Sequence, residues 1–437
     1  MNENGAKARR SLEGVRILDL TWLQVGPQAT RLLATFGAQV IRIEWREHKA
    51  IDFIRYVPPF APDHATAEGG RSQGVTRGRG IRGNYNRSAY FNNTNPGKYG
   101  ITLNLNHAKG RDLLRRMARD ANAICENFSP GQMDKWGLGY EHLRTINPRI
   151  IYVQTTGLGK AGVYKDYVSY GPTAQALSGL TFLSGLPEPR LPAGWGYSYL
   201  DHSPGYFGAI MLMAAIRRQR LNGTGCYIDM SQSETGLMLS GTSTIEHQLT
   251  GRPTARHGNR MPYRDWSPHG AYRCGGEDNW VAISVQSDEQ WRALIDQMGA
   301  PAWALDARFA TAVSRKQNED DLDSKLTGYT LGCERYELMN RLQARGIPAG
   351  VVQKASDRFD RDPQLKARGY FVDLPHSDIG TWPVEGFPAK MSRSPADVGG
   401  STGRAAPKLG EDNEFVFSKL VGLSQAEIAA LTEEGVI

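Results

Sequence analysis

The chain has few cysteines and no long apolar run, and these absences exclude several classes of protein. Its 437 residues include four widely spaced cysteines and no CxxC pair, so neither a zinc ribbon nor a thioredoxin-like motif is indicated. No apolar stretch approaches the ~20 residues that a membrane-spanning helix needs. The polar N-terminus contains no apolar core of a secretory signal. We therefore expect a cytoplasmic protein with reduced thiols.

Several motifs of common enzyme classes are also missing. The nine histidines show no HExxH or other paired spacing, which leaves a metal site without support. The chain has no GxSxG nucleophile elbow and no Walker A sequence. Gly157–Gly162 spells GxGxxG after an expected strand. A dinucleotide site would also need a following helix and an acid about twenty residues on. Neither is indicated, so we interpret this segment as a Gly-rich turn.

The charge distribution leaves one segment without acids. The net charge is +7, and no Asp or Glu lies between Gly69 and Ser88, where five arginines alternate with glycines. Arg-Gly segments of this kind can bind nucleic acid or phosphate. Because this one is short and unrepeated, a mobile, solvated loop over a ligand site is the preferred interpretation.

Short apolar runs alternate with helical patterns in the first half of the chain. Strands are expected at 15–20, 39–44, 123–127 and 149–153, and short apolar strands separated by helices indicate a doubly wound parallel sheet. Residues 251–276 read as a long loop, and a strand at 280–285 is followed by helical segments and a short apolar run at 347–352. The fold class is thus α/β, with a large Rossmann-like domain (1–225 with 375–437) and a smaller α/β domain with linkers (226–374).

One acid stands out between an aromatic segment and an expected helix. As a strand, residues 195–201 would place Trp195, Tyr197, Tyr199 and Asp201 on one face. Pro204 then favours the first turn of a helix. Such a carboxylate, pointing into an aromatic crevice, is a candidate catalytic group. On residue types alone, an acid near an N-cap beside core aromatics is the more ordinary interpretation.

A series of collinear motifs spans residues 12 to 412. They are LEGVRILDLT (12–21) with Gly26-Pro27, FGAQVIRIE (36–44), NPGK (95–98) before Leu103, ENFSPG (126–131), INPRIIY (146–152), Leu200-Asp201, GTG (223–225), DMS (229–231), GIPAG (346–350) and LGE (409–411). Together and in this order they resemble the family III CoA-transferases, which include formyl-CoA, carnitine and benzylsuccinate CoA-transferases. The benzylsuccinate enzymes' subunits are the most similar in general character.

The resemblance implies both an assembly and a set of site residues. It implies an interlocked dimer, either a homodimer or a heteromer with a paralogous subunit, with coenzyme A thioester as substrate and no permanently bound cofactor. It places the catalytic nucleophile at Asp201. It also implies CoA contacts at Gln24, Val25, Arg46, Leu103, Asn127, Phe128, Ser129 and Lys135. Lys135 stands where relatives often carry Arg, and Arg46 replaces a cation that is usual one position earlier, where this chain has Trp45.

The expected reaction moves CoA from an acyl-CoA donor, such as succinyl-CoA, to a carboxylic acid such as an aromatic succinate derivative. A carboxylate is ionised at neutral pH and needs no general base to attack a thioester. Trp195, Tyr197 and Tyr199 would suit a bulky acyl group, although they could equally line the pantetheine channel or a dimer interface. Arg260, in the 251–276 loop, is a candidate anchor for a second carboxylate.

Two alternatives stay open at this point. An α-methylacyl-CoA racemase would use an Asp and a His as an acid–base pair. A non-catalytic CoA-binding subunit of a heteromeric transferase is the other alternative, and the presence of Asp201 argues against it.

Overall fold

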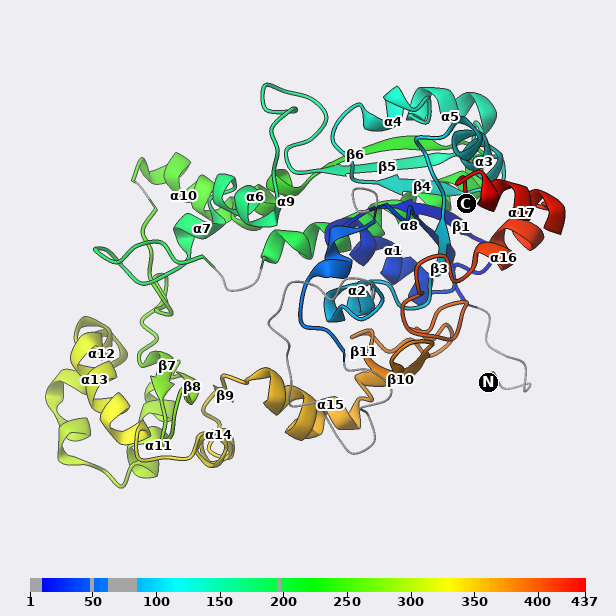
Figure 1. Cartoon of the computed structure of the whole chain (residues 1–437). Helices are drawn as coiled ribbons and strands as arrows, with labels where there is room; N and C mark the ends of the chain where they lie inside the picture. The colour runs from blue at the N-terminus through cyan, green and yellow to red at the C-terminus, as the bar shows by residue number, and fades with distance from the viewer. Residues whose placement is uncertain (1–9, 48–50, 62–84, 195–197, 253) are drawn as a thin grey trace. The chain divides into compact units, whose positions relative to one another are not determined.

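The computed structural model describes residues 10–47, 51–61, 85–194, 198–252 and 254–437. The chain divides into two compact units (Figure 1). Unit 1 comprises residues 1–180, 195–245 and 364–437, and unit 2 comprises residues 181–194 and 246–363. Most of the Arg/Gly segment, and also Trp195 and Tyr197, lie outside the described residues.

Unit 1 is built on a six-stranded sheet in which all neighbouring strands are parallel. The strands are β1 (Arg16–Leu20), β2 (Gln39–Glu44), β3 (Tyr99–Thr102), β4 (Ala123–Glu126), β5 (Ile151–Thr156) and β6 (Cys226–Ser231), and their spatial order is β3-β2-β1-β4-β5-β6. This is the strand order of a doubly wound dinucleotide-binding sheet, so the expected fold class is confirmed.

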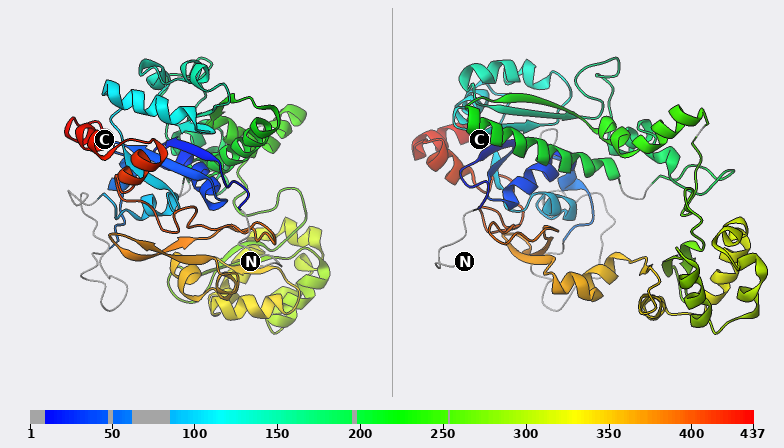
Figure 2. Two further views of the ribbon diagram at one scale, coloured as in Figure 1. Left: turned by 90° about the vertical axis from the view of Figure 1, so that its right-hand side faces the viewer. Right: turned by 180° about the vertical axis from the view of Figure 1, so that it is seen from behind.

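Alternate residues of each strand enter two different cores. Ile17, Val40 and Val153 contribute to one core, which α1 (Val25–Thr35) and α8 (Ser203–Asn222) cover. Leu18 and Ile41 contribute to the core on the opposite face. There the sheet is covered by α3 (Ala108–Arg119), α5 (Tyr140–Ile146) and α17 (Gln425–Glu433) (Figures 1 and 2). Burial on both faces explains why the strands are near-continuous apolar runs.

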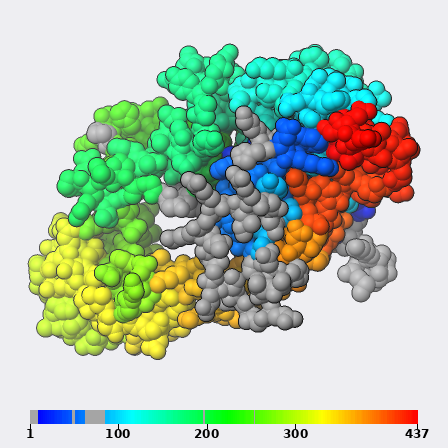
Figure 3. Space-filling model, in the orientation of Figure 1, coloured from blue at the N-terminus to red at the C-terminus, as the bar shows by residue number. Residues whose placement is uncertain are grey.

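The C-terminal part of the chain returns to unit 1. An antiparallel hairpin, β10 (Phe371–His376) and β11 (Gly380–Glu385), precedes the short helix α16 (Asn413–Phe415) and a π-helical turn at Val416–Leu420. A capping box formed by Ser424 and Glu427 opens α17. Figure 3 shows these C-terminal residues, in red, at the surface beside the cyan segment that carries α3. The backbone N–H of Asn104 donates to the carbonyl of Val436 at 2.9 Å, which fixes the C-terminus beside the end of β3.

Unit 2 contains a three-stranded antiparallel sheet with helices packed on it. The strands β7 (His269–Arg273), β8 (Trp280–Ser284) and β9 (Ala349–Val351) pair in that order. The helices α11 (Asp288–Gln297), α13 (Glu319–Thr330) and α14 (Arg335–Gln343) share its core. The remaining helices of the two units are α2 (Ala89–Thr94), α4 (Gln132–Lys135), α6 (Gly171–Leu177), α7 (Leu180–Leu183), α9 (Gln232–Leu239), α10 (Gly241–Thr250), α12 (Ala312–Gln317) and α15 (Pro363–Ala367).

Three sequence-based expectations are wrong or incomplete. Residues 199–201 form a 3₁₀ turn rather than the end of a strand, so Tyr199 and Asp201 do not share a strand face. The expected loop 251–276 contains β7 at its end. The hairpin at 371–385 was not predicted. Within the described ranges, no helix combines the length and the apolar character needed to cross a membrane.

Candidate active site

The strand order creates a crevice at the carboxyl ends of β1 and β4. β1 has β2 on one side and β4 on the other, so the chain winds in opposite directions from this point. In open α/β sheets, ligands bind outside the carboxyl ends of the strands at such a switch point. Two cavities lie here, and they share Trp22, Phe128 and Ser129 as lining residues.

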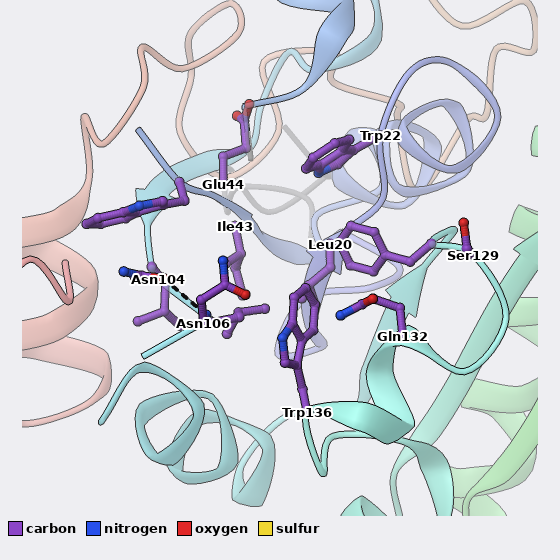
Figure 4. Close-up of a pocket in the computed structure, with 13 residues that line it drawn as sticks. Leu20, Trp22, Ile43, Glu44, Asn104, Asn106, Ser129, Gln132 and Trp136 are labelled. Atoms are coloured by element: carbon purple, nitrogen blue, oxygen red, sulfur yellow. Dashed lines mark hydrogen bonds between the residues drawn. The ribbon is translucent and has the colours of Figure 1, made fainter. Parts of the chain in front are cut away.

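The first cavity has a volume of about 390 Å³. It lies over the ends of β1, β2, β3 and β4 and is lined by Leu20, Trp22, Ile43, Glu44, Trp45, Leu103, Asn104, Leu105, Asn106, Phe128, Ser129, Gln132 and Trp136. In the view of Figure 4, Trp136 lies between Asn106 and Gln132. Flat apolar walls with a few amide groups suit a heteroaromatic base.

The aromatic walls of this cavity support one another. The ring of Phe128 meets Trp22 edge-on at a centroid distance of 5.5 Å and meets Trp136 edge-on at 5.7 Å. Edge-to-face contacts of this kind are favourable and fix ring orientation. Phe128 therefore holds one tryptophan from the loop after β1 and another from the turn after α4 in a defined arrangement.

The second cavity has a volume of about 330 Å³ and contains Asp201. Its other lining residues come from the β1–α1 loop, the turn after β4, the end of β5 and the segment before α6: Trp22, Leu23, Val25, Asn127, Phe128, Ser129, Pro130, Thr155, Thr156, Gly157, Leu158, Lys165, Asp166, Tyr167, Val168, Ser169, Tyr170, Gly171 and Gln232. The candidate nucleophile thus lies in a cavity that adjoins the aromatic one.

Asp201 lies on a 3₁₀ turn (Tyr199–Asp201) that leads directly into α8, the longest helix of the described chain. Burial raises the pKa of the Asp201 carboxyl above its ordinary value, while contacts with the Ser198 hydroxyl and the Gly171 backbone N–H lower it. Raised pKa values in a cavity are typical of functional carboxyls.

Gly171 permits the close approach of the Asp201 carboxylate to the start of α6. A Cβ atom on Gly171 would lie 2.3 Å from Asp201 Oδ1 and 2.4 Å from Asp201 Cγ. No side chain larger than hydrogen fits at this position unless the carboxylate moves. Glycine at position 171 thus leaves space for the Asp201 carboxylate.

Glu126, at the end of β4, supports the turn that separates the two cavities. Its carboxylate accepts a hydrogen bond from the backbone N–H of Phe128 at 2.8 Å and one from the Tyr152 hydroxyl at 3.2 Å. Burial raises the pKa of Glu126 to about 7. The hydrogen bond to Phe128 fixes the direction in which the chain leaves β4.

The structure brings six of the predicted site residues to the two cavities. Val25, Asn127 and Asp201 line the second cavity, Leu103 lines the first, and Phe128 and Ser129 line both. These positions all follow a strand end or open a helix of the Rossmann-like unit, which is where the resemblance placed CoA.

The other predicted residues that the structure describes are not part of either cavity lining. Gln24 immediately precedes α1, and Tyr199 begins the 3₁₀ turn. Lys135 ends α4. Exposed Arg46 packs its guanidinium over the Trp45 ring and donates to the Ile437 carbonyl. In unit 2, Arg260 forms ion pairs with Glu319, Asp320 and Asp323.

Sequence reasoning missed several lining residues that have no motif of their own. Trp22 and Trp136 line the first cavity, and Tyr167 and Tyr170 line the second. A usable signal for Trp22 was its position two residues after β1, at the switch point. The other three lie on turns and loops beside short helices, where periodicity gives no orientation.

His202 and the Gly-rich turn lack the features expected of an acid–base pair and of a dinucleotide site, respectively. His202 follows Asp201 but is not among the residues that line its cavity, and burial lowers the pKa of His202 to about 4. After Gly157–Gly162 the next helix begins at Gly171, so the turn lacks the helix of a dinucleotide site, as predicted. No cluster suited to a metal ion was found among the described residues.

Comparison with known proteins agrees with this geometry. Residues 12–413 match CoA-transferase family III. The chain belongs to this family, and it is a CoA-transferase. It is 29% identical to the succinyl-CoA–D-citramalate CoA-transferase of Chloroflexus aurantiacus, with 98% of each chain covered. It is 31% identical to the succinate–glutarate CoA-transferase of Agrobacterium fabrum, with 94% of this chain and 95% of that protein covered.

The fold of the CoA-transferase also matches a solved structure. A CaiB/BaiF family protein from Brucella suis superposes with a TM-score of 0.81 and 29% identity, covering 94% of this chain and all (100%) of that one. The Rossmann-like unit and the second unit therefore both belong to the architecture of this group.

Proposed function

We propose that this CoA-transferase moves CoA from succinyl-CoA to a second carboxylic acid, and that Asp201 is the nucleophile. The observation that carries the proposal is the position of Asp201 in a cavity that shares Trp22, Phe128 and Ser129 with the aromatic cavity. A ligand as long as a CoA thioester can extend from one cavity into the other. Its nucleotide end would then lie between aromatic walls and its thioester beside a carboxylate.

Different parts of the CoA molecule match the chemistry of the two cavities. The adenine would occupy the first cavity, where Trp22, Phe128 and Trp136 offer ring contacts. The pantetheine arm would pass the turn at Asn127–Ser129, whose polar groups match its amides. The thioester would reach Asp201 in the second cavity.

The proposed chemistry uses four displacements at acyl carbons. An Asp201 oxygen attacks the donor thioester, the C–S bond breaks, and a mixed anhydride and CoA thiolate form. The thiolate then attacks the aspartyl carbonyl, which gives an aspartyl-CoA thioester and releases the donor acid as a carboxylate. The acceptor carboxylate attacks this thioester and expels the thiolate, which finally attacks the acceptor acyl carbon of the new anhydride and restores Asp201. No net proton is taken up or released.

The tetrahedral intermediates require hydrogen-bond donors beside the reacting carbonyl. Gly157 and Leu158 line the same cavity as Asp201, and Gly157 carries no side chain that would block a backbone approach. A Cβ at Gly157 would lie 2.4 Å from Ser169 Cβ, so the turn is packed tightly in place. We assign the donor role to backbone amides of this turn.

The acceptor is proposed to be a dicarboxylic acid. Both relatives named above act on succinyl or succinate groups with a second dicarboxylic acid, according to their names. Lys165 is the one cationic side chain on the second cavity among the described residues, and it is the candidate partner for the distal carboxylate. Tyr167 and Tyr170 line the same cavity and would accommodate an aromatic substituent such as that of benzylsuccinate.

The test is a transfer assay with the purified chain. Succinyl-CoA is incubated with glutarate, citramalate, malate, benzylsuccinate and oxalate in turn, and new CoA thioesters are identified by mass spectrometry. Asp201→Asn and Asp201→Ala should abolish transfer while CoA binding persists. Asp166→Asn, which changes another carboxylate on the same cavity, should retain transfer. Trapping of an aspartyl-CoA adduct on the peptide that contains Asp201 is the expected covalent result.

Other outcomes would redirect the assignment. Substantial transfer by Asp201→Asn would refute the nucleophile. Epimerisation of a chiral 2-methylacyl-CoA without any acceptor acid would favour a racemase. CoA binding without turnover of any acid would favour a non-catalytic subunit.

We further propose that the active protein is an assembly of two chains. Large apolar side chains are exposed on α8 and α9, among them Ile210, Met211, Leu237 and Met238. Exposed apolar surface of this kind is typical of an interface. Molar mass measured by light scattering should equal twice that of the chain, and a monomeric mass for the active enzyme would contradict the proposal.

A further inference from the structure

The loop between β1 and α1, residues 21–24, contributes to both cavities and contains a strained residue. Leu23 has a φ of 62°, a left-handed conformation that is costly for a side chain branched beyond Cβ. Trp22 lines both cavities and Leu23 lines the second. Contacts with the surrounding protein must stabilise this conformation, since a leucine without such contacts would adopt a negative φ.

Asp52 holds Leu23 from behind the loop. The backbone N–H of Leu23 donates to Asp52 Oδ1 at 2.9 Å, and the N–H of Ile54 donates to the same oxygen at 3.1 Å. Asp52 is fully buried and is not among the residues that line either cavity. Its side chain reaches the site through the backbone of Leu23 and, by way of Arg42, through Glu44, which lines the first cavity.

Arg42 connects Asp52 to the preceding residue of the loop. Its guanidinium forms an ion pair with Asp52 and donates to the Thr21 carbonyl at 2.7 Å. Arg42 is completely buried. Two buried side chains thus fix the backbone of the loop on both sides of Trp22.

Asn127 fixes Trp22 from the opposite side of the crevice. Its side-chain oxygen accepts from the Trp22 N–H at 2.7 Å, and its side-chain nitrogen donates to the Trp22 carbonyl at 2.9 Å. This paired contact joins the loop after β1 to the turn after β4. The loop is consequently held at three successive residues while its Trp22 ring faces the cavities.

We propose that Asp52 is a positioning residue for CoA thioester binding, which it supports by holding Leu23 in the left-handed conformation that presents Trp22 to both cavities. This inference rests on the proposed function, because it takes the two cavities as the CoA site. It assigns Asp52 no contact with substrate. Loss of the Asp52 carboxylate should weaken acyl-CoA binding more than it slows the chemical steps.

The experiment compares Asp52→Ala with a control that removes a similar buried carboxylate elsewhere. Asp357 is buried in unit 2, pairs with Arg335 at 2.8 Å, and accepts from the Lys354 N–H at 2.8 Å, so Asp357→Ala should lower thermal stability in a similar way. Asp52→Ala should raise KM for succinyl-CoA about tenfold with kcat changed by less than about twofold. Asp357→Ala should leave KM unchanged.

A second variant tests the link through Leu23. Glycine adopts positive φ without steric cost. In a Leu23→Gly background, the left-handed conformation of residue 23 therefore depends less on the hydrogen bond to Asp52. Asp52→Ala should then raise KM by less than about threefold relative to Leu23→Gly alone. If Asp52→Ala does not fold, Asp52→Val, which fills the space of the side chain and offers no acceptor oxygen to the Leu23 N–H, takes its place in the same comparison.

The outcomes separate the two proposals. A KM for Asp52→Ala no higher than that of Asp357→Ala would overturn the positioning role, as would an effect undiminished by Leu23→Gly. Failure of the unaltered protein to bind succinyl-CoA or CoA would overturn the proposed function itself, and this inference with it.

Discussion

Replacement of Gly171 by alanine tests whether the position of the Asp201 carboxylate governs catalysis. The new Cβ would lie 2.3 Å from Asp201 Oδ1, whereas real Cβ atoms essentially never approach a heavy atom within 3.0 Å. The carboxylate and the backbone at position 171 must therefore move apart by at least the difference, 0.7 Å. A misplacement of about 1 Å in a reacting group costs roughly 10²-fold in rate. We expect Gly171→Ala to lower kcat by about 10²-fold.

The binding of CoA should change little, since Gly171 does not line the first cavity. The assay measures kcat and KM with succinyl-CoA and the best acceptor, together with the amount of aspartyl-CoA adduct at early times. Gly241→Ala is the matched control, because no atom lies within 4 Å of the Cβ it would add. A kcat for Gly171→Ala within about threefold of the control would refute the reasoning, as would a large rise in KM at unchanged kcat.

Three further predictions concern single groups around the cavities. Trp136→Ala should weaken CoA binding by about 1–3 kcal/mol, the usual value of stacking on a base. Lys135→Ala, whose side chain does not line the cavity, should change the calorimetric Kd for CoA much less. A larger loss of affinity in Lys135→Ala than in Trp136→Ala would contradict the placement of the adenine. Because the proposed nucleophile is the ionised form of Asp201, and burial raises the pKa of this carboxyl, kcat/KM should fall at a higher pH on the acidic side than it would with an ordinary aspartate. Asp166→Asn should not shift this acidic limb. Glu126 has a folded-state pKa of about 7, above its ordinary value of 4.5. The free energy of unfolding that its protonated form contributes should be complete below pH 4.5 and should be lost as the pH rises to 7. The free energy of unfolding of Glu126→Gln, measured by urea titration, should lack this pH dependence.

The parallel sheet was largely predictable because its strands are buried on both faces. Apolar runs such as 39–44 have a composition that loops rarely show. β3 was missed because it is only four residues long and contains Gly100. The β10–β11 hairpin was missed because Pro375 and Pro383 lie within its strands. Proline is tolerated there because a two-stranded hairpin has edges on both sides, where no N–H is needed for pairing.

The candidate site was predictable where it depends on strand ends and not where it depends on loops. Asn127 and Phe128 follow β4 directly, so the position of the strand fixes theirs. Alternating aromatics at 195–199 suggested a strand, but the backbone at Tyr199–Asp201 turns into a 3₁₀ helix that leads into α8. Short 3₁₀ turns are frequent at helix N-termini. The backbone here forms the turn that leads into the following helix and not the strand that the alternating aromatics predicted.

The placement of Asp201 on this turn has a mechanical consequence. The turn is continuous with α8, which packs with α1 on one face of the sheet. The contact is close at the N-terminal ends of both helices, where a Cβ on Gly205 would lie 2.8 Å from the Val25 carbonyl oxygen. α1 begins directly after the loop that carries Trp22. Because packed helices move as rigid elements, the distance between Asp201 and the loop that lines both cavities is set by this helix pair. In the proposed cycle Asp201 enters a mixed anhydride twice before it is restored. Each of the four proposed displacements needs sulfur, carbonyl and carboxylate to be aligned, and a helix pair that fixes this distance would preserve that alignment.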